Sequence, residues 1–107
     1  MSGVTGVTDD DSAGFAPPPF QPAAALAALQ RDLRALGLAE RAGCFERRGV
    51  AIARVAVDNA TLAAARVRRP SRNSPEWLPR VLRSSADVRD FVADLKRQLA
   101  LWSDRDD

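Results

Sequence analysis

Residues 50–67 decide the fold of this chain, and they read VAIARVAVDNATLAAARV. β-Branched residues recur in this stretch, and Asp58-Asn59 divides it into two short runs. Asp and Asn tolerate the positive φ angles that tight hairpin turns need. The stretch therefore predicts an antiparallel β-hairpin with strands over 50–57 and 61–67.

The register of this hairpin stays open between two alternatives. A two-residue turn pairs Val55 with Leu62 and puts Ile52, Arg54 and Val67 on the opposite face. A three-residue turn gathers Arg54, Arg66 and Arg68 on one face, because a one-residue slip moves every side chain across the sheet. We favour the two-residue turn, since alanine suits the left-handed position of a longer loop poorly. Both hairpin faces are then largely apolar, so we expect something besides one layer of helices to cover the second.

A helix is predicted on each side of the hairpin. Residues 23–36 are strong helix formers that follow Pro22 and end before Gly37. Their apolar stripe consists of Leu26, Leu29, Leu33 and Leu36. The last helix opens with the capping sequence Ser84-Ser85-Ala86-Asp87. Its apolar stripe consists of Val88, Phe91, Val92, Leu95, Leu99 and Trp102.

The predicted fold class is α+β, with an N-terminal helix, an antiparallel β-hairpin and a C-terminal helix packed on the sheet. Residues 38–44 are predicted as a connector, and residues 70–79 as a loop rich in proline and serine. Residues 78–83 are expected to form a third short strand rather than a helical turn.

The chain is expected to hold one domain. Residues 1–22 are predicted as a disordered acidic and proline-rich tail, residues 23–103 as the α+β domain, and residues 104–107 as a frayed acidic end. Two phenylalanines, Phe15 and Phe20, flank Pro17-Pro18-Pro19 in the tail. We expect them to be linker aromatics, or Phe20 to pack onto the first helix; the alternative is a docking motif for a partner.

Charge is unevenly distributed along the chain. Residues 41–89 hold eleven arginines against four acids, a surplus of +7, whereas residues 1–40 and 90–107 carry −3 and −2. One explanation of the arginine excess is the composition of a GC-rich genome, which favours arginine codons without any functional demand. The functional explanation is a surface that binds phosphates or carboxylates, for which the guanidinium group is suited. Candidate residues for contacts with a partner or a nucleic acid are Arg54, Arg66, Arg68, Arg69, Arg72, Trp77 and Arg80.

The residue types present argue against an enzyme. The chain has no histidine and no tyrosine, so it cannot build a Ser–His–Asp triad, and with one cysteine it lacks the ligands of ordinary zinc sites. Asp87, Asp90 and Asp94 share one side of the last helix, where we expect surface acids paired with Arg97 or Arg89. Cys44 is expected to be a small buried residue rather than a reactive thiol. We predict no catalytic residues, no metal and no cofactor.

Two functions remain after these exclusions. The favoured hypothesis is a protein-interaction module, such as an adaptor, chaperone or inhibitor, that pairs with a protein partner or with itself as a homodimer. The alternative is a nucleic-acid-binding accessory protein, in which arginines grip phosphates and Trp77 stacks on bases. No membrane contact and no small-molecule substrate are expected. Residues 1–14 lack the pattern of a signal peptide, which predicts a cytoplasmic location.

Overall fold

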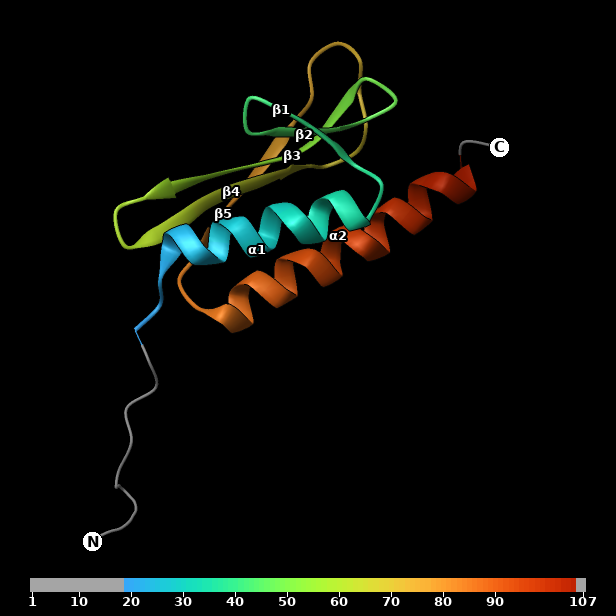
Figure 1. Ribbon diagram of the computed structural model, residues 1–107. Coiled ribbons are helices and arrows are strands. Elements are labelled where there is room, and N and C mark those ends of the chain that lie inside the picture. The colour runs from blue at the N-terminus through green and yellow to red at the C-terminus, as the bar shows by residue number, and fades with distance from the viewer. Residues whose placement is uncertain (1–18, 106–107) are drawn as a thin grey trace, which may run out of the picture.

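The computed structural model describes residues 19–105, which form two layers: a five-stranded antiparallel sheet and two helices that both cover the same face of it (Figure 1). The elements are α1 (Pro22–Ala35), β1 (Ala39–Arg41), β2 (Cys44–Arg47), β3 (Val50–Asp58), β4 (Thr61–Val67), β5 (Trp77–Leu82) and α2 (Ser85–Arg105). The strands lie in the order β1-β2-β3-β4-β5, so each pairs with its neighbour along the chain. The predicted α+β class is therefore confirmed.

The predicted hairpin with a third strand has too few strands, because β1 lies inside the segment predicted as a connector and β2 begins at the last residue of that segment. Two tight turns create them: Arg41 pairs with Cys44 across Ala42-Gly43, and Arg47 pairs with Val50 across Arg48-Gly49. All four turn residues have positive φ, between 52° and 81°. That is the sign pattern of the type I′ turns that join two-residue hairpins. The third predicted strand is confirmed as β5.

The β3–β4 hairpin has the two-residue turn, but at Asn59-Ala60 rather than Asp58-Asn59. Asn59 has a φ of 56°, and Asp58 is the last paired residue of β3, opposite Thr61. Val55 consequently pairs with Ala64, two residues from the predicted partner. A two-residue shift preserves which side chains share a face, so the predicted faces survive the wrong pairing except at Ile52 and Val67.

A bulge between β2 and β3 alters one end of the sheet. Phe45 pairs with Ala53 and Glu46 with Ala51, so Ile52 is an extra residue with no partner in β2. Extra residues of this kind interrupt the alternation of side chains. Ile52 and Ala53 are both fully buried, whereas simple alternation assigned Ile52 and Val67 to the second face. Val67 also belongs to the core, together with Ile52.

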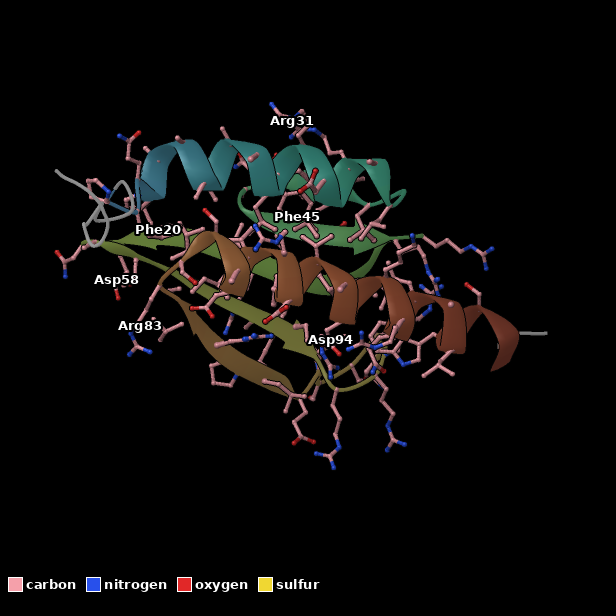
Figure 2. All side chains as sticks on the ribbon, turned by 90° about the horizontal axis from the view of Figure 1, so that it is seen from below. Phe20, Arg31, Phe45, Asp58, Arg83 and Asp94 are labelled. Atoms are coloured by element: carbon pink, nitrogen blue, oxygen red, sulfur yellow. The ribbon has the colours of Figure 1, made fainter. Side chains whose placement is uncertain are left out.

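Both helices follow the predicted stripes. Leu29 and Leu33 of α1 are fully buried, and α1 ends in a Schellman motif in which Gly37 N–H donates to the Arg34 carbonyl and Leu38 N–H to the Leu33 carbonyl. The buried residues of α2 are Val88, Phe91, Leu95, Leu99 and Trp102. The stripes place the helices side by side over one face of the sheet, as the view from below shows (Figure 2).

The start of α2 is capped as the sequence indicates. Asp87 N–H donates to Ser84 Oγ over 3.1 Å, and Asp87 in turn accepts a hydrogen bond from Arg83 N–H over 2.9 Å. The carboxylate thus reaches one residue further back than in a standard capping box. Both bonds fix the point where the chain leaves β5 and enters the helix.

The two ends of the chain fall partly outside this description. Most of the predicted tail, including Phe15, lies outside the described residues, as do Asp106 and Asp107. Phe20, at the near end of the tail, is partly buried against the core. In the part of the chain that is described, neither helix combines the length and the apolar character needed to cross a membrane.

Candidate interaction surface

The face of the sheet that points away from α1 and α2 is the first candidate site, and we call it the open face. Its assignment follows from alternation along the strands. Glu40 of β1 bonds to Arg34 of α1, and Arg66 of β4 bonds to Asp94 of α2, so these side chains mark the helix side. Their sequence neighbours and the cross-strand partners of those neighbours lie on the other side. The open face consists of Arg41, Cys44, Glu46, Arg54, Ala56, Asp58, Ala63, Ala65, Trp77, Pro79 and Val81.

Small apolar side chains occupy the middle of the open face. Ala56 pairs with Ala63 across β3 and β4, and Ala63 pairs with Val81 across β4 and β5. Val81 is 45 % exposed, one of the most exposed large apolar residues among those described. A shallow hollow of about 380 Å³ runs over this region, floored by alanines and edged by Arg54 and Pro79. The surface is therefore flat, largely uncharged at its centre, and open to solvent.

Arg54 and Trp77 form one unit at the side of this hollow. The Arg54 guanidinium lies 4.3 Å from the centre of the Trp77 ring, a cation–π contact between β3 and β5. Ala65 lies between these strands, paired with both Arg54 and Pro79, and only 4 % of it is exposed. The ring of Trp77 is thus engaged by an arginine of the same chain.

The remaining predicted site residues do not share a single surface. Arg66 and Arg80 lie on the helix side: Arg66 Nε is 2.5 Å from Asp94 Oδ2, and Arg80 Nη2 is 4.0 Å from Asp90 Oδ2. Both acids belong to the side of α2 predicted as solvated surface, yet Asp94 is only 23 % exposed because it faces β4. Asp94 also pairs with Arg97, as the sequence suggested.

The loop between β4 and β5 carries the other three predicted arginines. Arg68 contacts Glu76 over 3.5 Å, and both side chains are well exposed. Arg69 and Arg72 are exposed, and within residues 19–105 neither has an ion pair. The structure consequently divides the predicted arginine set among the open face, the helix side and this loop.

Cys44 lies on the open face beside Arg41 and Arg54, its partners in register. Burial raises the pKa of the Cys44 thiol, and the neighbouring carboxylate of Glu46 raises it further, against the lowering influence of the two arginines. The thiol is half-buried rather than fully buried. A raised pKa favours the protonated thiol over the reactive thiolate at neutral pH.

Metal ligands do not gather anywhere in the described part of the chain, where no three acidic or thiol side chains come together. Comparison with protein-family models, with curated proteins and with solved structures finds no match for this chain. The function is therefore inferred from the geometry of the open face itself.

Proposed function

We propose that this chain is a protein-interaction module that pairs with a second copy of itself through the open face. The observation that carries this proposal is that both helices cover one face of the sheet, whereas the other face is apolar at its centre. Antiparallel sheets that leave one face to water ordinarily carry polar side chains there. Here the central outward positions hold Ala56, Ala63, Pro79 and Val81.

Packing of two such faces is physically favourable. Stacked sheets pack about 10 Å apart when their side chains interdigitate, and small side chains permit a close approach over a wide area. A contiguous exposed apolar patch of this kind is typical of interaction sites. An isologous pair would bury the same alanine surface twice.

Charge balance favours a second copy over a nucleic acid as the occupant of this face. Arg41 and Arg54 are offset by Glu46 and by Asp58 at the end of β3, so the face carries no net charge. Two copies would not repel each other, and each face offers both signs of charge at its rim. A phosphate backbone, in contrast, is attracted by a surplus of positive charge.

The test is the molar mass in solution, measured by sedimentation equilibrium. The wild type is expected at twice the chain mass of 11.6 kDa. The Ala63→Glu variant introduces a carboxylate at the centre of the open face, where pairing would bury it without a partner, so its mass should fall to that of one chain. Ala56→Glu, on the neighbouring strand, should behave in the same way.

Ala93→Glu is the matched control, because Ala93 is an exposed alanine on α2. Its mass should remain that of the wild type, and circular dichroism should show native helix and sheet in all three variants. A monomeric wild type at high micromolar concentration contradicts the proposal. A dimer that survives both open-face variants contradicts it equally.

A further inference from the structure

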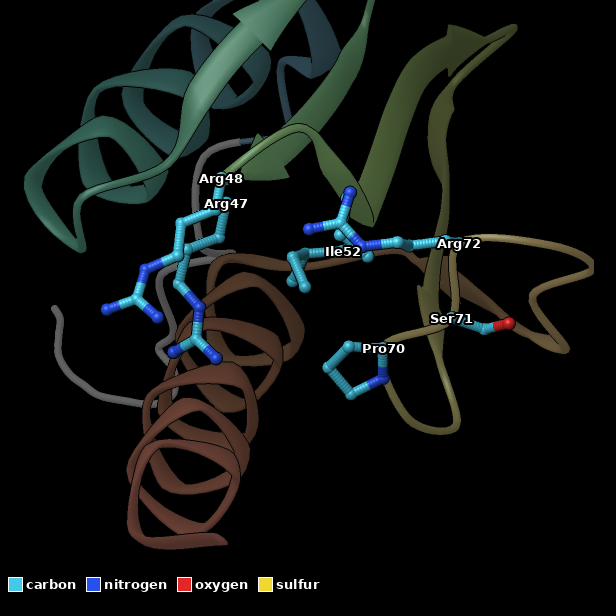
Figure 3. Close-up of a pocket in the computed structure, with 7 residues that line it drawn as sticks. Arg47, Arg48, Ile52, Pro70, Ser71 and Arg72 are labelled. Atoms are coloured by element: carbon cyan, nitrogen blue, oxygen red, sulfur yellow. The ribbon is translucent and has the colours of Figure 1, made fainter. Parts of the chain in front are cut away.

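A second surface lies at the end of the sheet where the β2–β3 turn meets the β4–β5 loop. A hollow of about 340 Å³ opens there, lined by Arg47, Arg48, Val50, Ile52, Pro70, Ser71 and Arg72. Figure 3 shows Arg47 and Arg48 on one side, Pro70 and Ser71 on the other, and the Arg72 side chain directed across the hollow above Ile52. Arginines from two separate segments of the chain therefore line one space.

The lining contains three arginines and no carboxylate. Arg48 and Arg72 are exposed, and within residues 19–105 neither has an ion pair or a hydrogen bond from its side chain. Like charges this close repel each other unless something neutralises them. The hollow thus brings two exposed arginines without an ion pair in the described chain, Arg48 and Arg72, to one space.

One of the three arginines is held in place by α2. Arg47 Nη1 donates to Ser103 Oγ over 2.9 Å and to the Leu99 carbonyl over 3.4 Å. These contacts fix the guanidinium against the last turns of the helix, at the edge of the hollow. Ser71 Oγ accepts a hydrogen bond from Asn73 N–H, which leaves its hydroxyl hydrogen available as a donor beside the arginines.

We propose that this hollow binds a compact ligand with two or more phosphate groups. Guanidinium groups make bidentate, charge-assisted contacts to phosphate oxygens, and two of them from separate segments suit a ligand with two phosphate groups better than a single carboxylate. The residues that would contact the ligand are Arg48, Arg72 and Ser71. Ile52 and Pro70 supply an apolar floor and wall.

A compact ligand is favoured over a single-stranded nucleic acid because the lining offers no aromatic ring for base stacking. Such binding ordinarily combines charge with aromatic side chains on which successive bases stack. Trp77, the aromatic residue that the sequence singled out for stacking, does not line the hollow and is covered by Arg54.

Isothermal titration calorimetry with inorganic triphosphate, at low ionic strength, tests this proposal. The wild type should bind, and the Arg48→Asn/Arg72→Ala double variant should bind at least about tenfold more weakly, since charge-assisted contacts of this kind each contribute roughly one to two decades of affinity. Arg48 has a φ of 56°, which asparagine tolerates better than arginine, so loss of binding would not reflect loss of the fold.

Arg31→Ala is the matched control, since Arg31 is an exposed arginine on α1 that does not line the hollow. Its affinity should remain within about twofold of the wild type, because general surface charge contributes little at one position. No binding by the wild type, or an equal loss in the control, would overturn the proposal. Tighter binding of a short single-stranded oligonucleotide, lost in the same double variant, would overturn the compact ligand and replace it with a nucleic acid.

Discussion

The ion pair between Arg66 and Asp94 offers the sharpest test of how β4 faces α2. Its two side chains are 18 % and 23 % exposed, which lies between a surface pair and a fully buried one. Arg66 Nη1 also donates to the Val67 carbonyl over 3.0 Å. Removing the guanidinium therefore leaves a partly buried carboxylate whose one remaining cationic partner in the described part of the chain is Arg97, 3.6 Å away.

The expected loss of stability follows from this intermediate burial. Exposed pairs contribute about 0.2–1 kcal/mol, and breaking a buried pair costs about 3–5 kcal/mol. Arg66→Ala should therefore destabilise the domain by about 1.5–3 kcal/mol. Arg97 retains part of the interaction, so the coupling energy between Arg66 and Asp94 should be about 1–2 kcal/mol. For a domain of this size, each kcal/mol lowers the melting temperature by about 4–8 °C.

A double-mutant cycle measures this coupling directly. Arg66→Ala, Asp94→Ala and the double variant are unfolded with urea beside the wild type, with Arg31→Ala as a control that should change stability by less than about 0.5 kcal/mol. A coupling energy near zero would contradict the ion pair between β4 and α2. It would mean that Arg66 does not face α2, and the three-residue register with its arginine cluster would return as the better interpretation.

Three further predictions follow from the turns, the cap and the thiol. Arg48→Gly should stabilise the domain by about 0.5–1 kcal/mol in urea unfolding, because the left-handed conformation at Arg48 strains any residue with a Cβ; an unchanged or lower stability would contradict this. Ser84→Ala should cost about 1 kcal/mol through loss of the bond from Asp87 N–H, and no loss in thermal unfolding would show that the cap contributes nothing. The alkylation rate of Cys44 should reach half its maximum at a higher pH than that of an unfolded thiol, because its pKa is raised; a midpoint at lower pH would contradict the burial and the influence of Glu46.

Local signals predicted the helices well. The leucine stripe of α1, the Gly37 stop and the Ser84 cap each act within a few residues, so they can be interpreted without knowledge of the tertiary fold. The same holds for the β3–β4 hairpin, although Asn59 rather than Asp58 takes the first turn position. The turn thereby moves by one residue and the strand pairing by two. The sequence could not exclude this pairing, because it leaves the two faces unchanged.

The two short strands were missed because their turns lack the usual residues. Type I′ turns favour Asn-Gly or Asp-Gly, whereas this chain uses Ala42-Gly43 and Arg48-Gly49. The six-residue spacing of these glycines was the available signal, since it fits two consecutive turns joined by a strand of four residues. The bulge at Ile52 gave no comparable signal, because it depends on how β2 meets β3.

For the candidate sites, too, the sequence predicted the local features but not those that depend on tertiary contacts. The apolar character of both hairpin faces could be predicted, and it leads directly to the open face. The surface on which each arginine lies could not be predicted, because the acids that pair with Arg66 and Arg80 lie on α2, far along the chain. The hollow lined by Arg47, Arg48 and Arg72 likewise requires two distant segments to meet.

Hydroxyl-radical footprinting of the wild type, below and above the concentration at which its mass doubles, tests whether two copies pair through the open face. Val81 on the open face and Leu101 on α2 are matched reporters, with 45 % and 52 % of their surfaces exposed. If two copies pair through the open face, oxidation of Val81 should fall with rising concentration while that of Leu101 stays constant. Protection of Leu101 with Val81 unchanged would place the interface on the helices and contradict pairing through the open face.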